Sequence, residues 1–211
     1  MPVFKSGKGL APAWCELESF EIVRLAPGEG REFKREGKKE KLIVGAGHCV
    51  VRCGGVKIEA GEGSNLDFEA PAGPYAAVAG EAGATLIRMR GRWGDKTGGS
   101  GLFGVRKAEV FQPAGDPWNY PKDTNFDNHY HDCDEYWIFY EGRGVAVSEG
   151  KSFEVGPGDC VVTGMGQHHD FPQAFEPVRA VYFETTLEGR KRLGHLWDHA
   201  HGPASPDPKR I

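Results

Sequence analysis

The sequence predicts an all-β protein, an antiparallel sandwich or barrel, from its strand pattern, its turn residues and its lack of helical periodicity. Short runs rich in Val, Ile, Phe and Tyr alternate with glycine clusters. With 31 glycines and 14 prolines in 211 residues, this spacing is typical of short strands joined by tight turns. Apolar residues at helical spacing persist for no more than about two turns. We therefore expect at most one short helix, at residues 187–201.

The candidate strands follow one another in two groups that are separated by a glycine-rich segment, residues 91–104. Each strand ends at a turn signal such as Gly-Gly, Glu-Gly or Pro-Gly. In chain order the segments read KLIVGAG, CVVRCGG, VKIEAGEG, AVAG and ATLIRM, then EYWIFYEGRG, VAVSEG, SFEVGPGD, CVVTGMG and RAVYFETT.

The two groups resemble each other at a constant offset of 95 residues, which places Glu40 under Glu135. Several glycines match at the same offset: Gly47 with Gly142, Gly61 with Gly156, and Gly63 with Gly158. Ordered matches at one offset favour an internal duplication over chance. We predict two barrels, residues 1–104 and 105–211, with the glycine-rich segment as their connection.

Charge and hydropathy exclude several function classes. The formal net charge is −4 and the basic clusters are short, so we do not expect nucleic-acid binding. No apolar run approaches the ~20 residues that span a bilayer, and the N-terminus does not read as a secretory signal. We expect a cytoplasmic protein that acts on a small molecule, and the sequence leaves its oligomeric state open, a homodimer included.

The cysteines agree with a reducing compartment. Five cysteines are an odd number and form no CxxC pair, so reduced thiols suit them better than a disulfide framework. They are Cys15, Cys49, Cys53, Cys133 and Cys160.

Histidines cluster in the second half of the chain. His129, His131 and Glu135 are separated by even steps, so in an extended segment all three side chains point to one face. His169 follows 34 residues after Glu135, behind a glycine-rich turn. Buried imidazoles and a carboxylate are costly unless they are paired or bind a metal. Such a set suits one divalent transition metal, Mn, Fe, Co, Ni, Cu or Zn.

These residues resemble the two motifs of the cupin superfamily. The pattern His129-Tyr-His131-x3-Glu135-x6-Gly142 is similar to the first motif, and the run from Gly158 to His169 is similar to the second. The resemblance implies a double-stranded β-helix, or jelly roll, in which His129, His131, Glu135 and His169 bind the metal inside the barrel. At the matching positions the first half has residues that cannot form this site: Lys34, Glu36, Glu40 and Ala76. The resemblance thus implies a bicupin with a degenerate, metal-free first barrel.

Candidate catalytic residues come from the last strand of each half. In the first half we expect Ile87 and Met89 to line the barrel interior, because apolar faces point inward. At the offset of 95 their counterparts are Tyr182 and Glu184, which we predict to transfer protons beside the metal.

Other residues complete the predicted pocket. Trp137 shares the parity of Glu135 and is a candidate pocket wall, and Lys122 lies in a polar loop that could reach an anionic or hydroxylated substrate. Core packing explains Trp137 equally well. We interpret His195, His199 and His201 as solvated side chains rather than a second metal site.

Three function classes fit this site. The first is a metal-dependent isomerase, epimerase or lyase in carbohydrate metabolism, acting on a small sugar or sugar acid. The second is an iron-dependent cupin dioxygenase, and the third is a binding or sensor protein that uses the metal only to hold its ligand. A proton-transfer glutamate has an obvious task in the first class, which we favour.

Overall fold

The structure is a computed structural model, and it describes residues 3–7, 11–36, 38–69, 73–186 and 206–210. In this part of the chain it contains fourteen β-strands and no helix, which confirms the all-β prediction. No helix that could cross a membrane occurs there. All five cysteines are free thiols. The predicted helix at 187–201 and its three histidines, His195, His199 and His201, lie outside the described residues.

The chain forms two compact units. One consists of Glu16–Trp93 and is called the Glu40 unit below. The other combines Met1–Cys15 with Gly94–Ile211 and is called the His129 unit. The segment interpreted as a connection contains a strand, β8 (Ser100–Val105), that belongs to the His129 unit. That the two units are copies of one barrel stays a prediction.

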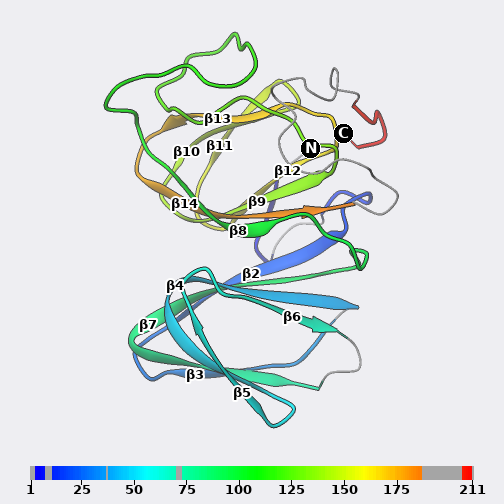
Figure 1. Ribbon diagram of the computed structural model, residues 1–211, viewed down its shortest axis with the longest axis vertical. Helices are drawn as coiled ribbons and strands as arrows, with labels where there is room; N and C mark the ends of the chain where they lie inside the picture. Colours follow the sequence, from blue (N-terminus) through cyan, green and yellow to red (C-terminus); the bar gives the residue numbers. More distant parts are fainter. Residues whose placement is uncertain (1–2, 8–10, 37, 70–72, 187–205, 211) are drawn as a thin grey trace. The chain divides into compact units, whose positions relative to one another are not determined.

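The Glu40 unit is built on two long strands, β4 (Lys39–Cys53) and β7 (Tyr75–Gly91), which pair along most of their length (Figure 1). The sheet order is β2-β7-β4-β5, with β3 on β7 and β6 on β4. Both long strands change register near Gly47, whose φ is +75°. A Cβ there would lie 2.2 Å from the Gly83 carbonyl oxygen, so glycine is required. The remaining strands are β2 (Leu17–Leu25), β3 (Gly30–Phe33), β5 (Val56–Gly61) and β6 (Asn65–Glu69).

A buried ionic network lies inside the Glu40 unit. Glu40 is 1% exposed and accepts two hydrogen bonds from Arg88, from Nε at 2.7 Å and from Nη2 at 2.9 Å. Tyr75 donates to the same carboxylate at 2.5 Å, and Arg88 also donates to Glu21 at 2.8 Å. Burial and then the Glu40 carboxylate raise the pKa of Tyr75, so the phenol stays protonated. A guanidinium and a hydroxyl therefore compensate the buried charge.

This network corrects one expectation. The core of the Glu40 unit contains Ala84 and Leu86, and Arg88 continues the same face of β7. Ile87 and Met89 are fully buried but lie on the opposite face, so the prediction that they line this interior was wrong. The physical reason is that Arg88 is charge-compensated and can occupy an interior position that its polarity would otherwise forbid.

The His129 unit has two sheets, visible as two layers in Figure 1. One has the strand order β1-β12-β9-β14-β8 and the other β11-β10-β13. Its core takes apolar side chains from both sheets, among them Trp137 and Phe139 of the first and Ala146 and Phe171 of the second. The remaining strands are β1 (Val3–Lys5), β9 (Asp134–Glu141), β10 (Gly144–Ser148), β11 (Lys151–Val155), β12 (Asp159–Thr163), β13 (His169–Ala174) and β14 (Val178–Thr185).

Candidate metal centre

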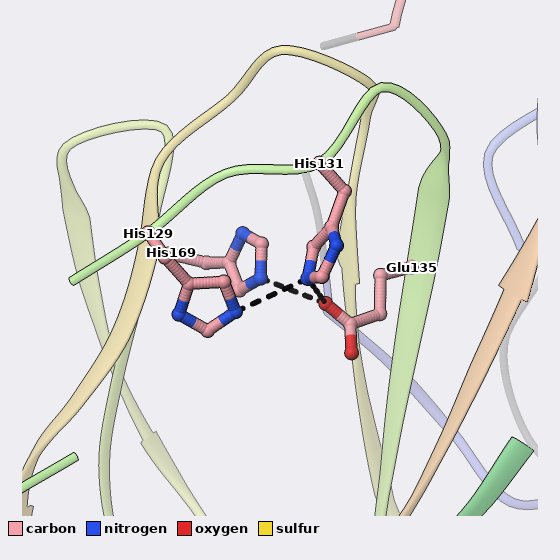
Figure 2. Close-up of side chains that lie close together, drawn as sticks. All are labelled: His129, His131, Glu135 and His169. Atoms are coloured by element: carbon pink, nitrogen blue, oxygen red, sulfur yellow. Dashed lines mark hydrogen bonds and ion pairs between the residues drawn. The ribbon is translucent and has the colours of Figure 1, made fainter. Parts of the chain in front are cut away.

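The four predicted metal ligands come together inside the His129 unit (Figure 2). Glu135 lies on β9, and His169 opens β13. His129 pairs with His169 through two backbone hydrogen bonds of 3.1 and 2.9 Å. A bend separates His131 from β9, so the two histidines precede the strand instead of lying in it. All four side chains are buried, with exposures between 1% and 5%.

The ligand atoms converge on one point. The Nε2 atoms of His129 and His131 are 3.1 Å apart, and His131 Nε2 is 3.1 Å from Glu135 Oε2. His169 Nε2 lies 2.7 Å from the same oxygen. One ligand atom from each of the four residues lies within 4.8 Å of the other three. This spacing leaves room for one ion between three imidazole nitrogens and a carboxylate oxygen.

Backbone carbonyls orient two of the imidazoles. His129 Nδ1 is 3.0 Å from the carbonyl oxygen of Asp127, and His169 Nδ1 is 3.2 Å from that of Gln167. A nitrogen that faces a carbonyl must carry the proton, which leaves the lone pair on Nε2. Both rings therefore present a ligand atom to the centre.

Electrostatics also fit a bound cation. Burial and then the neighbouring imidazole of His129 lower the pKa of His169 to about 4, so the ring is neutral at pH 7. The pKa of Glu135 lies well below its usual range because charge on His131 and His169 outweighs the effect of burial. A neutral His169 imidazole does not supply the positive charge that would hold the Glu135 carboxylate ionised. Burial keeps the His169 imidazole neutral, so a divalent cation bound here would supply the positive charge that stabilises the Glu135 carboxylate.

Two buried atoms support this view. Glu135 Oε2 and His169 Nε2 are 2.7 Å apart, yet neither has a hydrogen-bond partner among the described residues. Buried polar atoms are rarely left in this state unless an ion or a water completes them. The donor set of three imidazoles and one carboxylate fits a divalent transition metal.

A cavity of about 360 Å³ opens beside the four ligands. The candidate ligands His129, His131 and Glu135 line it, and so do three further predicted residues: Trp137, Tyr182 and Glu184. The other lining side chains are Phe103, Phe126 and Asp127, which the sequence analysis did not select. The cavity thus combines aromatic side chains with carboxylates, and the catalytic roles of Tyr182 and Glu184 stay predictions.

Glu184 is held in a fixed orientation. Its carboxylate accepts a hydrogen bond of 2.6 Å from the Gly99 N–H at Oε2, and Oε1 lies 3.6 Å from His131 Nδ1. A Cβ on Gly98 would lie 2.2 Å from Oε2, so only glycine allows the chain to pass so close. Sequence reasoning missed this contact, although the glycines were visible in the segment interpreted as a connection. With Cys133, Glu184 and His131 form a second close group, in which burial and then the Glu184 charge raise the pKa of the thiol.

Strand register does not support the pairing of Tyr182 with Ile87 and of Glu184 with Met89 that the offset of 95 residues gives. Trp137 pairs with Tyr182 between β9 and β14. Leu42, which the offset places under Trp137, pairs with Arg88 between β4 and β7. Tyr182 therefore corresponds to Arg88 by register, and not to Ile87. The two residues were selected from an incorrect pairing, yet both line the cavity.

Tyr182 lines the cavity beside the ligands, whereas Lys122 does not. Burial and then the Glu184 carboxylate raise the pKa of Tyr182, so its hydroxyl is protonated at neutral pH. Lys122 does not line the cavity: its ammonium lies 2.6 Å from the Asp170 carboxylate, and both side chains are buried. Contact between Lys122 and a substrate stays a prediction.

Comparison with known proteins gives a family and a fold. No protein-family model matches the chain. The uncharacterized protein y4oW of Sinorhizobium fredii is 47% identical over 211 residues, which cover all of this chain and 97% of that protein. The chain therefore belongs to the same family as y4oW.

Solved structures show the fold. AerE from Microcystis aeruginosa matches 79% of this chain and 87% of its own, with 9% identity and a TM-score of 0.54. Oxalate decarboxylase from Bacillus subtilis, a protein with Mn(II) centres, matches 78% of this chain and 67% of its own, with 12% identity and a TM-score of 0.51. These proteins share the β fold of this chain, in agreement with the predicted jelly roll, and at these identities the likeness extends to the fold alone.

Proposed function

We propose that the protein is a metal-dependent enzyme that transfers a proton on a small polar metabolite, a sugar or a sugar acid, as an isomerase, epimerase or lyase. The observation that carries this proposal is one cavity that brings together three of the four clustered candidate ligands, the Glu184 carboxylate and the Tyr182 hydroxyl. Proton transfer requires an acid or base within reach of the substrate, and both groups face the same space.

Each protein group has a distinct task in this scheme. When bound, a divalent cation would supply Lewis-acid polarisation of a substrate oxygen. Glu184 is fixed at Oε2 by Gly99, which leaves Oε1 to accept a proton from the substrate. Tyr182 keeps its proton and can donate a hydrogen bond to a substrate oxygen. Trp137 and Phe126 exclude water from the far side of the cavity.

Solvent hydrogen exchange tests the proposal. The wild type is incubated in D₂O with a panel of aldoses, ketoses and sugar acids, and deuterium incorporation is followed by NMR. We expect deuterium at one carbon of the true substrate, and a rate that falls ~10²-fold or more in Glu184→Gln while metal content stays at the wild-type level. Full exchange in that variant would contradict a proton-transfer role for Glu184.

A second candidate function rests on the aromatic walls. Phe103, Phe126 and Trp137 give the cavity an aromatic wall, a setting that also suits an iron-dependent dioxygenase. Oxygen uptake by the iron-loaded protein, without deuterium incorporation, would favour that function. If neither reaction occurs while a metal-dependent ligand is still bound, the third class, a binding or sensor protein, applies.

A further inference from the structure

A second cavity of the His129 unit is separate from the metal centre. Its volume is about 430 Å³, and its lining includes Trp118, Asn119, Tyr120, Asn128, Val147 and His168. Asn128 precedes the ligand His129, and His168 precedes the ligand His169. Side chains alternate along extended chain, so these two residues face away from the metal. We call this space the rear cavity.

The walls of the rear cavity are fixed by buried contacts. The Asn128 amide donates to the carbonyl oxygens of Asp116 and Pro117 at 3.3 and 3.2 Å. The Thr124 hydroxyl donates to the carbonyl of Phe171 at 2.5 Å, which fastens the same loop to β13. A cavity that is already formed takes a ligand without the entropic cost of ordering its walls.

The charged groups that the 116–122 loop and β13 place next to the rear cavity are compensated. The Lys122 ammonium is paired with Asp170 at 2.6 Å, and Tyr120 donates to the same carboxylate at 2.8 Å. His168 Nε2 lies 2.8 Å from the Asp116 carboxylate, whose side chain is 7% exposed. A charged ligand would lose its hydration in this cavity and would have to compete with these pairs for an opposite charge.

Aromatic and amide groups remain for the ligand. Trp118 has the Lys122 ammonium 4.8 Å from its ring centre, which makes the ring a poor site for a second cation. Its remaining surface and the Tyr120 ring offer apolar contact, while Asn119 offers hydrogen bonds. A ring that carries hydroxyls on its edge and C–H groups on its faces fits these walls, because its faces can pack on the aromatic side chains while its hydroxyls bond to the amide.

We propose that the rear cavity binds an uncharged, hydroxylated ring of monosaccharide size. The cavity beside the four candidate ligands is called the metal-side cavity. The proposal does not depend on metal chemistry, because no residue of the rear cavity lines the metal-side cavity. A ligand there would lie behind the paired segments that carry His129 and His169.

Calorimetric titration tests the proposal with D-glucose, D-galactose, D-mannose and myo-inositol as probes. We expect saturable binding of at least one of them at one site per chain, and affinity about tenfold or more lower for the charged analogues D-glucuronate and D-glucosamine. Trp118→Ala should weaken binding at least about tenfold. Asn119 is exposed, so Asn119→Ala keeps the fold and should weaken binding several-fold.

Two control variants separate the rear cavity from other sites. Phe175→Ala removes an aromatic side chain that is 52% exposed and lines neither cavity, and it should bind as the wild type does. Trp137→Phe alters the metal-side cavity and should retain the binding that Trp118→Ala weakens. Absence of saturable binding overturns the proposal, as does equal affinity for the charged analogues. Binding that is lost in Trp137→Phe but retained in Trp118→Ala places the sugar beside the metal and also overturns it.

Discussion

Two buried carboxylates, Glu40 and Glu135, show two ways of stabilising a charge inside a β-barrel. Glu40 is compensated by the guanidinium of Arg88, which is part of the chain. Glu135 is surrounded by imidazoles, of which His169 is neutral at pH 7. The first arrangement is complete without a ligand, whereas in the described part of the chain the ion pairs of Glu135 are with imidazoles alone. The comparison is the basis for our proposal that the Glu40 unit is a structural support and that the His129 unit binds a divalent cation.

Breaking the ion pair of the Glu40 unit should have the largest effect. Arg88→Met leaves Glu40 buried without a counter-charge, so we expect the free energy of unfolding to fall by about 3–5 kcal/mol. Chemical denaturation measures this loss. As a control, Arg92→Ala removes a pair with Glu18 whose side chains are 44% and 47% exposed, and it should cost about 1 kcal/mol or less. A loss for Arg88→Met as small as that of the control would show that Glu40 needs no partner.

Metal binding should stabilise the protein through the other carboxylate. At a free metal concentration of 100 times Kd, linkage predicts a gain of about 2.7 kcal/mol in the free energy of unfolding. The gain should vanish in a double variant, His129→Ala with His131→Ala, and persist in Glu40→Gln. Thermal unfolding with and without added Mn²⁺ or Zn²⁺ measures it. Stabilisation that persists in the double variant would place the ion elsewhere.

A third buried carboxylate, Glu149, extends the comparison. It is paired neither with a buried guanidinium, as Glu40 is, nor with a cluster of imidazoles, as Glu135 is. Its side chain is 5% exposed, both oxygens have no hydrogen-bond partner among the described residues, and its distance to Lys151 is 3.8 Å. Burial raises the pKa of Glu149, despite the opposing effect of Lys151. The folded protein therefore binds this proton more tightly than the unfolded chain, so stability falls as the pH rises through the folded pKa.

Replacing Glu149 should accordingly have the smallest effect, and it should be favourable. We expect Glu149→Gln to raise the free energy of unfolding by on the order of 1 kcal/mol at pH 7. Below the ordinary carboxyl pKa the gain should be small, because the wild type and the variant are then both neutral at this position. Urea unfolding at pH 7 and near pH 4 tests this. A gain of equal size at both pH values would show that charge is not the cause.

Local sequence patterns predicted the fold class and the ligand set. Alternating apolar residues between glycine turns indicate strands within a few residues of sequence. His129, His131 and Glu135 lie within seven residues of one another, so their spacing alone indicated that they could share one site. His169 was found because its glycine-rich turn resembles a known motif. Such features depend on neighbours in the sequence.

Contacts between distant residues could not be predicted in this way. Gly99 and Glu184 are 85 residues apart, and Lys122 and Asp170 are 48 apart, so no local pattern joins them. Arg88 misled the assignment of the interior face because a buried arginine is compensated by residues that sequence alone does not identify. Strand propensity can be judged from neighbouring residues. The compensation of a buried charge depends on residues that only the folded chain brings together.

Anomalous diffraction at the absorption edge of the native metal tests the central claim most directly. Crystals of protein purified without a histidine tag or added metal are measured after elemental analysis identifies the bound ion. The account predicts one anomalous peak per chain, enclosed by His129, His131, Glu135 and His169, and none beside Glu40 and Arg88. A peak beside Glu40, or bound metal with no peak among the three histidines, would contradict it.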